Sequence, residues 1–105
     1  MISRIWKGIT TKANAEAYEE LLINTIFPEI KTKNIKGFTD ISLLRRKMEE
    51  NVEFVTIMKF SDMNSVKDFA GKDYAKSYVP DDALKLLLDY DKEAKHYNLI
   101  INCNN

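Results

Sequence analysis

The chain has few of the residues on which many catalytic and metal sites depend. Its 105 residues include one cysteine, Cys103, and one histidine, His96. A single cysteine excludes a disulfide within the chain and a cysteine-rich zinc site, and a single histidine excludes a multi-histidine metal centre. We therefore expect no resident metal ion, and we expect the reducing cytoplasm as the compartment.

Glycine and long apolar runs are also scarce. The three glycines, Gly8, Gly37 and Gly71, stand alone, so neither the dinucleotide-binding motif G-x-G-x-x-G nor a P-loop is present. The longest apolar runs span a few residues, far fewer than the ~20 that cross a bilayer. The N-terminal segment carries Arg4 and Lys7 and lacks the apolar core of a secretory signal. These absences predict no membrane association and no phosphate-binding loop.

Charge of one sign is not in excess either. The 16 basic residues (Lys+Arg) balance the 16 acidic residues (Asp+Glu). A net charge of zero gives no electrostatic footprint for nucleic acid or anionic lipid, and no overall repulsion opposes self-association. The apolar share of 45% and the charged share of 30% are typical of a soluble globular protein. The length fits a single domain over residues 1–105.

The residues that are present predict alternating strands and helices. Apolar and β-branched patterns predict strands at 1–10, 38–47, 52–60 and 94–101. Helical spacing predicts helices at 13–30, loosened near Phe27 by Pro28, and at 63–70, ending at Gly71. Thr11 or Asn14 could cap the first helix, and Ser61-Asp62 the second. A helical turn at 73–78, a short helix from Pro80 through Leu88 and a loop at 89–91 are expected before the last strand.

This element order, β-α-β-β-α-β, predicts an α+β fold of the ferredoxin-like type. Right-handed crossovers place both helices on one face of a four-stranded antiparallel sheet. The strand at 52–60 is apolar on both faces, with Phe54 and Met58 on one and Val55 and Ile57 on the other. Because the helices cover only one face, we expect a second copy to cover the other, giving a homodimer through the sheet face. The alternative is that the extra helical segment or the C-terminal tail wraps that face.

Five side chains are candidates for a site. His96 is the only group with an ordinary pKa near neutrality, so it is either a general base or an ordinary strand histidine. Arg4, on the first strand, must be paired or line a cavity unless its face is solvated. Trp6 could form the floor of a pocket or belong to the core. Tyr74 and Tyr78 are four residues apart and either line a pocket mouth or simply pack.

Six segments spread over almost the whole chain form a recognisable set. They are RIW-x-G-x-T at 4–10, ANAEAYEELL at 13–22, LLRR at 43–46, VEFVTIM at 52–58, FAG-x-DY at 69–74 and HY at 96–97. Together they resemble a bacterial subgroup of the antibiotic biosynthesis monooxygenase family. The resemblance implies a dimeric α+β barrel, in which two ferredoxin-like protomers pack sheet to sheet and each holds a pocket between its helices and its sheet.

The resemblance also implies a chemistry. Characterised members oxidise small electron-rich aromatics, such as quinols and polyketides, with O₂ and without metal, flavin or another cofactor. Carried over to this chain, His96 is the expected base and Arg4 steadies the oxyanion, while Trp6, Tyr74 and Tyr78 hold the ring. The chain departs from similar sequences at two positions. The position of Lys7 often holds another large polar or basic group in those sequences, and the position of Lys59 is commonly aromatic.

Two other functions are compatible with this fold. The first is a non-catalytic small-molecule-binding or stress-response α+β barrel dimer, which the short inventory of polar residues favours. The second is haem degradation, for which relatives hold haem with an asparagine on the first strand and a histidine on the second helix. The present chain has Ser3 and Arg4 at the start of the first strand and no histidine in either helix, so haem degradation is disfavoured.

Overall fold

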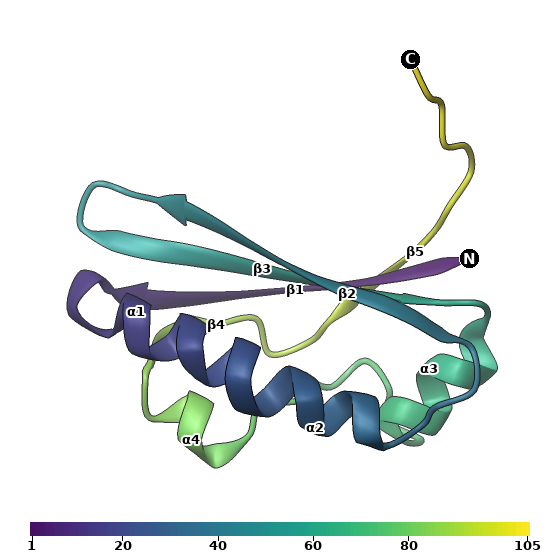
Figure 1. Ribbon diagram of the computed structural model, residues 1–105, viewed down its shortest axis with the longest axis horizontal. Helices are drawn as coiled ribbons and strands as arrows, with labels where there is room; N and C mark the ends of the chain where they lie inside the picture. The colour runs from purple at the N-terminus through teal and green to yellow at the C-terminus, as the bar shows by residue number, and fades with distance from the viewer.

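A computed structural model describes residues 1–105, which form two layers (Figure 1). One layer is an antiparallel sheet of five strands: β1 (Ile2–Thr11), β2 (Phe38–Lys47), β3 (Asn51–Phe60), β4 (Leu87–Tyr90) and β5 (Lys95–Asn98). The other layer contains α1 (Lys12–Leu21), the π-helical turn η1 (Leu22–Ile26), α2 (Phe27–Thr32), α3 (Met63–Ala70) and α4 (Asp81–Leu84). All of the helices lie on the same side of the sheet (Figure 1). None of them is long and apolar enough to span a bilayer.

The strand order confirms the predicted ferredoxin-like arrangement. The sheet runs β2-β3-β1, and both β4 and β5 pair with the remaining edge of β1. Gly8 lies opposite Tyr90 of β4, and Arg4 lies opposite His96 of β5. The fourth position of the sheet is therefore filled by two short strands in succession, where the sequence predicts one longer strand.

The C-terminal third differs from the sequence prediction. The helix expected from Pro80 through Leu88 ends at Leu84, and Leu87–Tyr90, which overlaps the expected loop at 89–91, forms β4. Pairing with β1 satisfies backbone groups that would otherwise remain at a free sheet edge. The last strand is confined to Lys95–Asn98, shorter than the predicted 94–101.

The expected helical turn at 73–78 does not form a helix. Residues 73–76 form a single turn, in which the Lys76 amide donates to the Asp73 carbonyl at 3.0 Å, and the segment is held by backbone hydrogen bonds to the chain that follows β4. The Ser77 amide donates to the Lys92 carbonyl at 3.1 Å, and the Ala94 amide donates to the Ala75 carbonyl at 2.7 Å. These partners are distant in sequence, so local helical spacing could not reveal them.

The long helical segment that packs on the sheet confirms two predictions from the sequence, its N-terminal cap and its irregularity near Pro28. The Thr11 side chain accepts a hydrogen bond from the Asn14 amide at 3.2 Å and so caps α1. Further along, the helix loosens into η1, where the Phe27 amide donates to the carbonyl of Leu22, five residues back. Pro28 follows directly and has no N–H to continue the α-helical ladder, which is a common cause of such a local irregularity.

The core lies between the helices and one face of the sheet. The alternate residues of β3 that face the helices include Phe54, Met58 and Phe60, all of them buried. The ring of Tyr18 on α1 lies 4.9 Å from that of Phe54, and the ring of Phe69 on α3 lies 5.9 Å from that of Phe60. These aromatic contacts join each end of the helical layer to the same strand.

The other face of the sheet has no covering layer. Val55 and Ile57 of β3 lie on it and are only partly buried, and Leu44 of β2 is 48% exposed. The segment with α4 lies on the helical side, and the C-terminal tail points away from the sheet (Figure 1), with Ile100 88% exposed. The alternative that one of these segments wraps the face is therefore wrong for the single chain.

Two adjacent threonines allow a test of this packing. The Thr10 hydroxyl is buried and has no hydrogen-bond partner, whereas the Thr11 hydroxyl caps α1. Replacing Thr10 by Val removes an unsatisfied polar group, so Thr10→Val should raise the free energy of unfolding by about 1 kcal/mol. Thr11→Val should lower it by about 1 kcal/mol because the cap is lost. Urea denaturation of both variants measures the two effects, and changes of equal sign would contradict this account.

Candidate functional site

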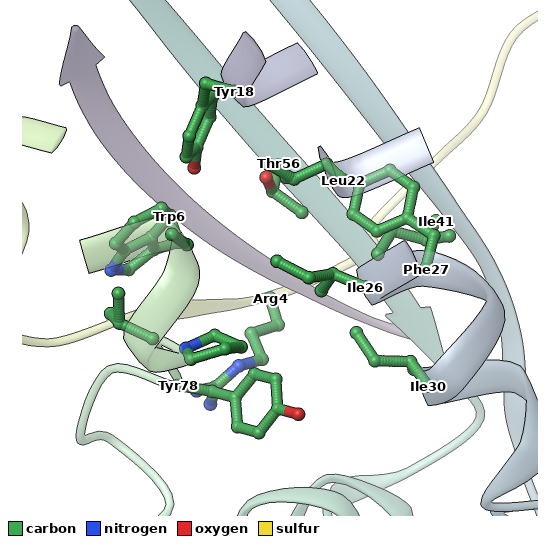
Figure 2. A pocket seen from close by; sticks show the side chains of 13 residues that line it. Arg4, Trp6, Tyr18, Leu22, Ile26, Phe27, Ile30, Ile41, Thr56 and Tyr78 are labelled. Carbon is green, nitrogen blue, oxygen red and sulfur yellow. The ribbon is translucent and has the colours of Figure 1, made fainter. Parts of the chain in front are cut away.

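A pocket lies between the helices and the covered face of the sheet (Figure 2). It contains about 480 Å³ not occupied by protein atoms, part of it open to solvent. Ten of its thirteen lining residues are hydrophobic. The helices contribute Tyr18, Leu22, Ile26, Phe27, Ile30 and Ala83; the strands contribute Arg4, Trp6, Ile41 and Thr56; and the segment before α4 contributes Tyr78, Val79 and Pro80. No lining residue is His, Cys, Asp or Glu, and the chain has no cluster of such residues that could hold a metal ion.

Arg4 brings a buried positive charge to this pocket. The residue is 4% exposed, and its Nη1 and Nη2 donate to the carbonyl oxygens of Tyr74 at 2.5 Å and Lys76 at 3.1 Å. No carboxylate pairs with it, because the ion pairs of the chain involve only Arg45 and Arg46. Burial lowers the pKa of Arg4 to about 10, so the guanidinium stays charged at neutral pH. The pocket therefore contains a cation that no acidic side chain neutralises.

His96 contacts the same guanidinium from β5. Its Nε2 lies 3.0 Å from Arg4 Nη1. Because a guanidinium only donates, Nε2 accepts, and the proton of the neutral ring is then on Nδ1. Burial, and then the charge of Arg4, lower the pKa of His96 below its usual value. The imidazole is thus neutral at physiological pH and carries an acceptor lone pair directed at Arg4.

Trp6 forms a fixed wall of the pocket. Its indole N–H is shared between the Ser77 hydroxyl and the Asp91 carbonyl, each at 2.8 Å, so it is already satisfied by the protein. The ring leans over Gly8, where an added Cβ would lie 3.2 Å from two of its carbon atoms. A residue without a side chain at position 8 therefore leaves room for the indole. Trp6 offers the pocket an apolar ring and no free donor.

The structure brings all five predicted site residues into one region, but only three of them line the pocket. Arg4, Trp6 and Tyr78 line the pocket, and Tyr78 is 39% exposed. His96 and Tyr74 do not line it. Instead, both contact Arg4, and the Tyr74 ring meets the His96 ring edge-on at 5.4 Å. These two residues therefore support the guanidinium from behind the pocket surface.

Sequence reasoning missed two polar residues of the pocket, Tyr18 and Thr56. Tyr18 belongs to the inward stripe of α1, and Thr56 has an inward position on β3. In the sequence both belong to patterns that indicate core packing. Their one sequence feature that could have indicated a binding role is a hydroxyl at a position where the surrounding pattern predicts an apolar side chain.

Solved structures share this architecture. A Bacillus cereus protein whose name assigns it to the antibiotic biosynthesis monooxygenases matches with a TM-score of 0.68 and 13% identity, covering 99% of this chain and 97% of its own. A Shewanella oneidensis protein matches with a TM-score of 0.64 and 19% sequence identity, covering 91% of this chain and 89% of its own. SnoaB is a cofactor-independent oxygenase from Streptomyces nogalater. The structure of one of its mutants, with an asparagine replaced by alanine, matches with a TM-score of 0.58 and 13% sequence identity, covering 99% of this chain and 97% of its own.

The chain has the fold of these proteins. The predicted resemblance to antibiotic biosynthesis monooxygenases is thus confirmed at the level of fold. No protein-family model and no curated protein sequence matches the chain. At these identities the shared architecture does not carry the activity with it, because one fold serves many functions.

The lowered pKa of His96 has a consequence for stability. The unfolded chain binds a proton at His96 at higher pH than the folded chain does, so stability should fall as the pH drops from about 7.5 to about 5. His96→Gln keeps an acceptor for Arg4 but does not titrate. Because His96 is the only histidine, urea midpoints of this variant should vary less over that range. An equal pH dependence in the two proteins would show that His96 is not the source.

Proposed function

We propose that the chain is a cofactor-independent monooxygenase acting on a small electron-rich aromatic, such as a quinol or a polyketide-like compound. The observation that carries this proposal is the unneutralised Arg4 guanidinium in contact with a neutral histidine beside an apolar pocket. The fold shared with SnoaB, a cofactor-independent oxygenase, supports it.

In this mechanism the substrate supplies the electrons. An acidic hydroxyl or activated C–H group of the aromatic enters between Arg4 and His96 and takes over their mutual contact. His96 accepts the proton on Nε2, and the positive charge of Arg4 stabilises the resulting oxyanion. The electron-rich anion then reduces O₂. When a ring CH₂ group becomes a carbonyl, one oxygen atom is retained by the product and the other leaves as water.

The protein's remaining contribution is the environment. Apolar walls exclude water, which strengthens the interaction between the oxyanion and Arg4. Trp6 and Tyr78 present ring faces or edges to a flat ligand, and Tyr74 acts at the Arg4–His96 pair. No metal or organic cofactor is required by these steps, and we propose that none is used.

One observation favours a second candidate function. His96 does not line the pocket, and its acceptor nitrogen is already bonded to Arg4. A pocket with a cation but no accessible base could bind a small acidic aromatic without transforming it. The alternative is thus a non-catalytic small-molecule-binding dimer, and the role of His96 separates the two functions.

Oxygen consumption distinguishes these functions. With a panel of anthrones and quinols, the wild type should consume O₂ faster than the buffer control. The rate should rise with pH through a value below the usual pKa of histidine and then level off, because the base must be neutral. His96→Gln should lower the rate by about 10²-fold or more, the usual contribution of a general base.

A matched control is Lys95→Gln, which alters the exposed neighbour of His96 on the same strand and should leave the rate unchanged. If His96→Gln retains the wild-type rate and pH profile, His96 only positions Arg4. If no compound of the panel is oxidised although the protein binds it, the non-catalytic reading replaces the oxygenase.

We also propose that the working unit is a homodimer joined through the uncovered face of the sheet. Ile5, Val55, Ile57 and Leu44 place apolar surface there, and no helix covers them. Burying one such side chain contributes about 1.5–3 kcal/mol, so a face with several of them favours association. The zero net charge does not oppose the approach of a second copy.

A charge on this face should separate the protomers. Light scattering should give the wild type twice the chain mass of 12.2 kDa, and Ile57→Lys should shift it toward the single-chain mass at micromolar concentration. Ile23→Lys is the control, because Ile23 is 52% exposed on the helical side, away from the sheet. A wild type with the single-chain mass would contradict the dimer.

A further inference from the structure

The Tyr18 side chain is almost completely buried, yet its hydroxyl has no partner in the protein. The residue is 1% exposed and packs its ring on Phe54, and none of the hydrogen bonds of the structure involves its oxygen. The side chain lines the pocket, and Figure 2 shows its hydroxyl oxygen pointing toward the space between the labelled side chains. The Thr10 hydroxyl is the only fully buried side-chain polar atom without a partner, so the Tyr18 oxygen keeps access to the pocket and can donate to water or a ligand there.

Thr56 adds a second hydroxyl to the same space. It also lines the pocket, and no hydrogen bond of the protein involves its side chain. In Figure 2 its oxygen is on the side of the residue that faces Tyr18. The two groups come from different layers, α1 and β3, and both line the same pocket.

Strand register places Thr56 at a distance from Arg4. Thr56 lies opposite Trp6 on β1, and Arg4 lies opposite Met58, two residues further along β3. Two residues of a strand span about 7 Å, comparable to the length of a two-ring aromatic system. The Trp6 ring also lines the pocket, and Trp6 lies opposite Thr56 in the strand register.

We infer that Tyr18 and Thr56 form a second polar anchor, which donates hydrogen bonds to a carbonyl oxygen of an aromatic ligand whose acidic oxygen lies at Arg4. The ligand class is a flat ring system with two oxygen functions of different kinds, an acidic hydroxyl and a ketone or quinone carbonyl. This inference rests on the proposed function for the use of the pocket, and it names residues that determine which aromatic is selected.

The chemistry of each end sets the orientation of the ligand. Arg4 keeps N–H groups that are not used by Tyr74, Lys76 or His96, and its charge favours an anionic oxygen. Burial raises the pKa of Tyr18 well above its ordinary value, so its hydroxyl stays protonated and acts as a donor rather than a base. A neutral carbonyl fits the Tyr18 end, and an oxyanion fits the Arg4 end.

The test uses two probes with the same ring size, one with carbonyls and one without. 2-Hydroxy-1,4-naphthoquinone has two carbonyls and a hydroxyl that is ionised at neutral pH, whereas 2-naphthol has a weakly acidic hydroxyl alone, so each variant is compared with the wild type on the same probe. Trp6 is the only tryptophan of the chain and lines the pocket, so quenching of its fluorescence reports occupancy without any turnover. Binding is titrated for wild type, Tyr18→Phe, Thr56→Val and a control, Tyr97→Phe, whose ring is exposed on β5.

Tyr18→Phe should weaken binding of the quinone about tenfold, the upper range for one neutral hydrogen bond, and Thr56→Val should weaken it by several-fold. Neither variant should change 2-naphthol binding or lower the thermal midpoint, because each hydroxyl lacks a protein partner. Equal quinone affinity in wild type and Tyr18→Phe, or no quinone binding by the wild type, would overturn the inference. Failure of the proposed oxygenase is seen separately, as absence of O₂ consumption, and leaves this binding test valid.

Discussion

Arg4 lies beneath the helices with its guanidinium largely removed from water, and no carboxylate neutralises it. A buried charge is costly unless hydrogen bonds compensate it, and here two carbonyls of the segment before α4 and the ring of His96 pair with three of the N–H groups of Arg4. The same contacts hold that segment against β1 and β5. Tyr78, a few residues further on, can therefore form one wall of the pocket. The position of the segment before α4, the protonation of His96 and the shape of the pocket all depend on the Arg4 side chain.

The resulting site is chemically sparse. Its lining offers one permanent cation and a few hydroxyls among apolar walls. Such a site can recognise an acidic aromatic and exclude water, but it holds no side-chain group able to supply electrons. A reaction here must draw its electrons from the substrate, which is why oxygenation of an electron-rich aromatic is the chemistry we propose. The uncovered face of the sheet is a separate feature, since it lies across the sheet from the pocket.

The sequence predicted the first two-thirds of the fold well, because those elements carry their own periodicity. The inward stripe of the long helix, its cap at Thr11 and its irregularity at Pro28 are local features, and each was readable. The same holds for β3, whose predicted span of 52–60 agrees with Asn51–Phe60; the second copy that its two apolar faces predict on the uncovered side stays a prediction. Prediction failed after Gly71. There Leu87–Tyr90 is only four residues long and forms a strand because β1 offers an unpaired edge.

The sequence by itself determined the fold class and that Arg4 and Trp6 share one face of the first strand, because strand alternation fixes which side chains share a face. It did not determine that this face is the one covered by the helices. Only the tertiary structure decided that His96 faces Arg4, that Tyr74 supports the pair from behind, and that Tyr18 and Thr56 share a cavity. These relations join residues far apart in the chain, through strand register and through the packing of a helix on a sheet. A single sequence records the preference of each residue for burial, but not which buried residues meet.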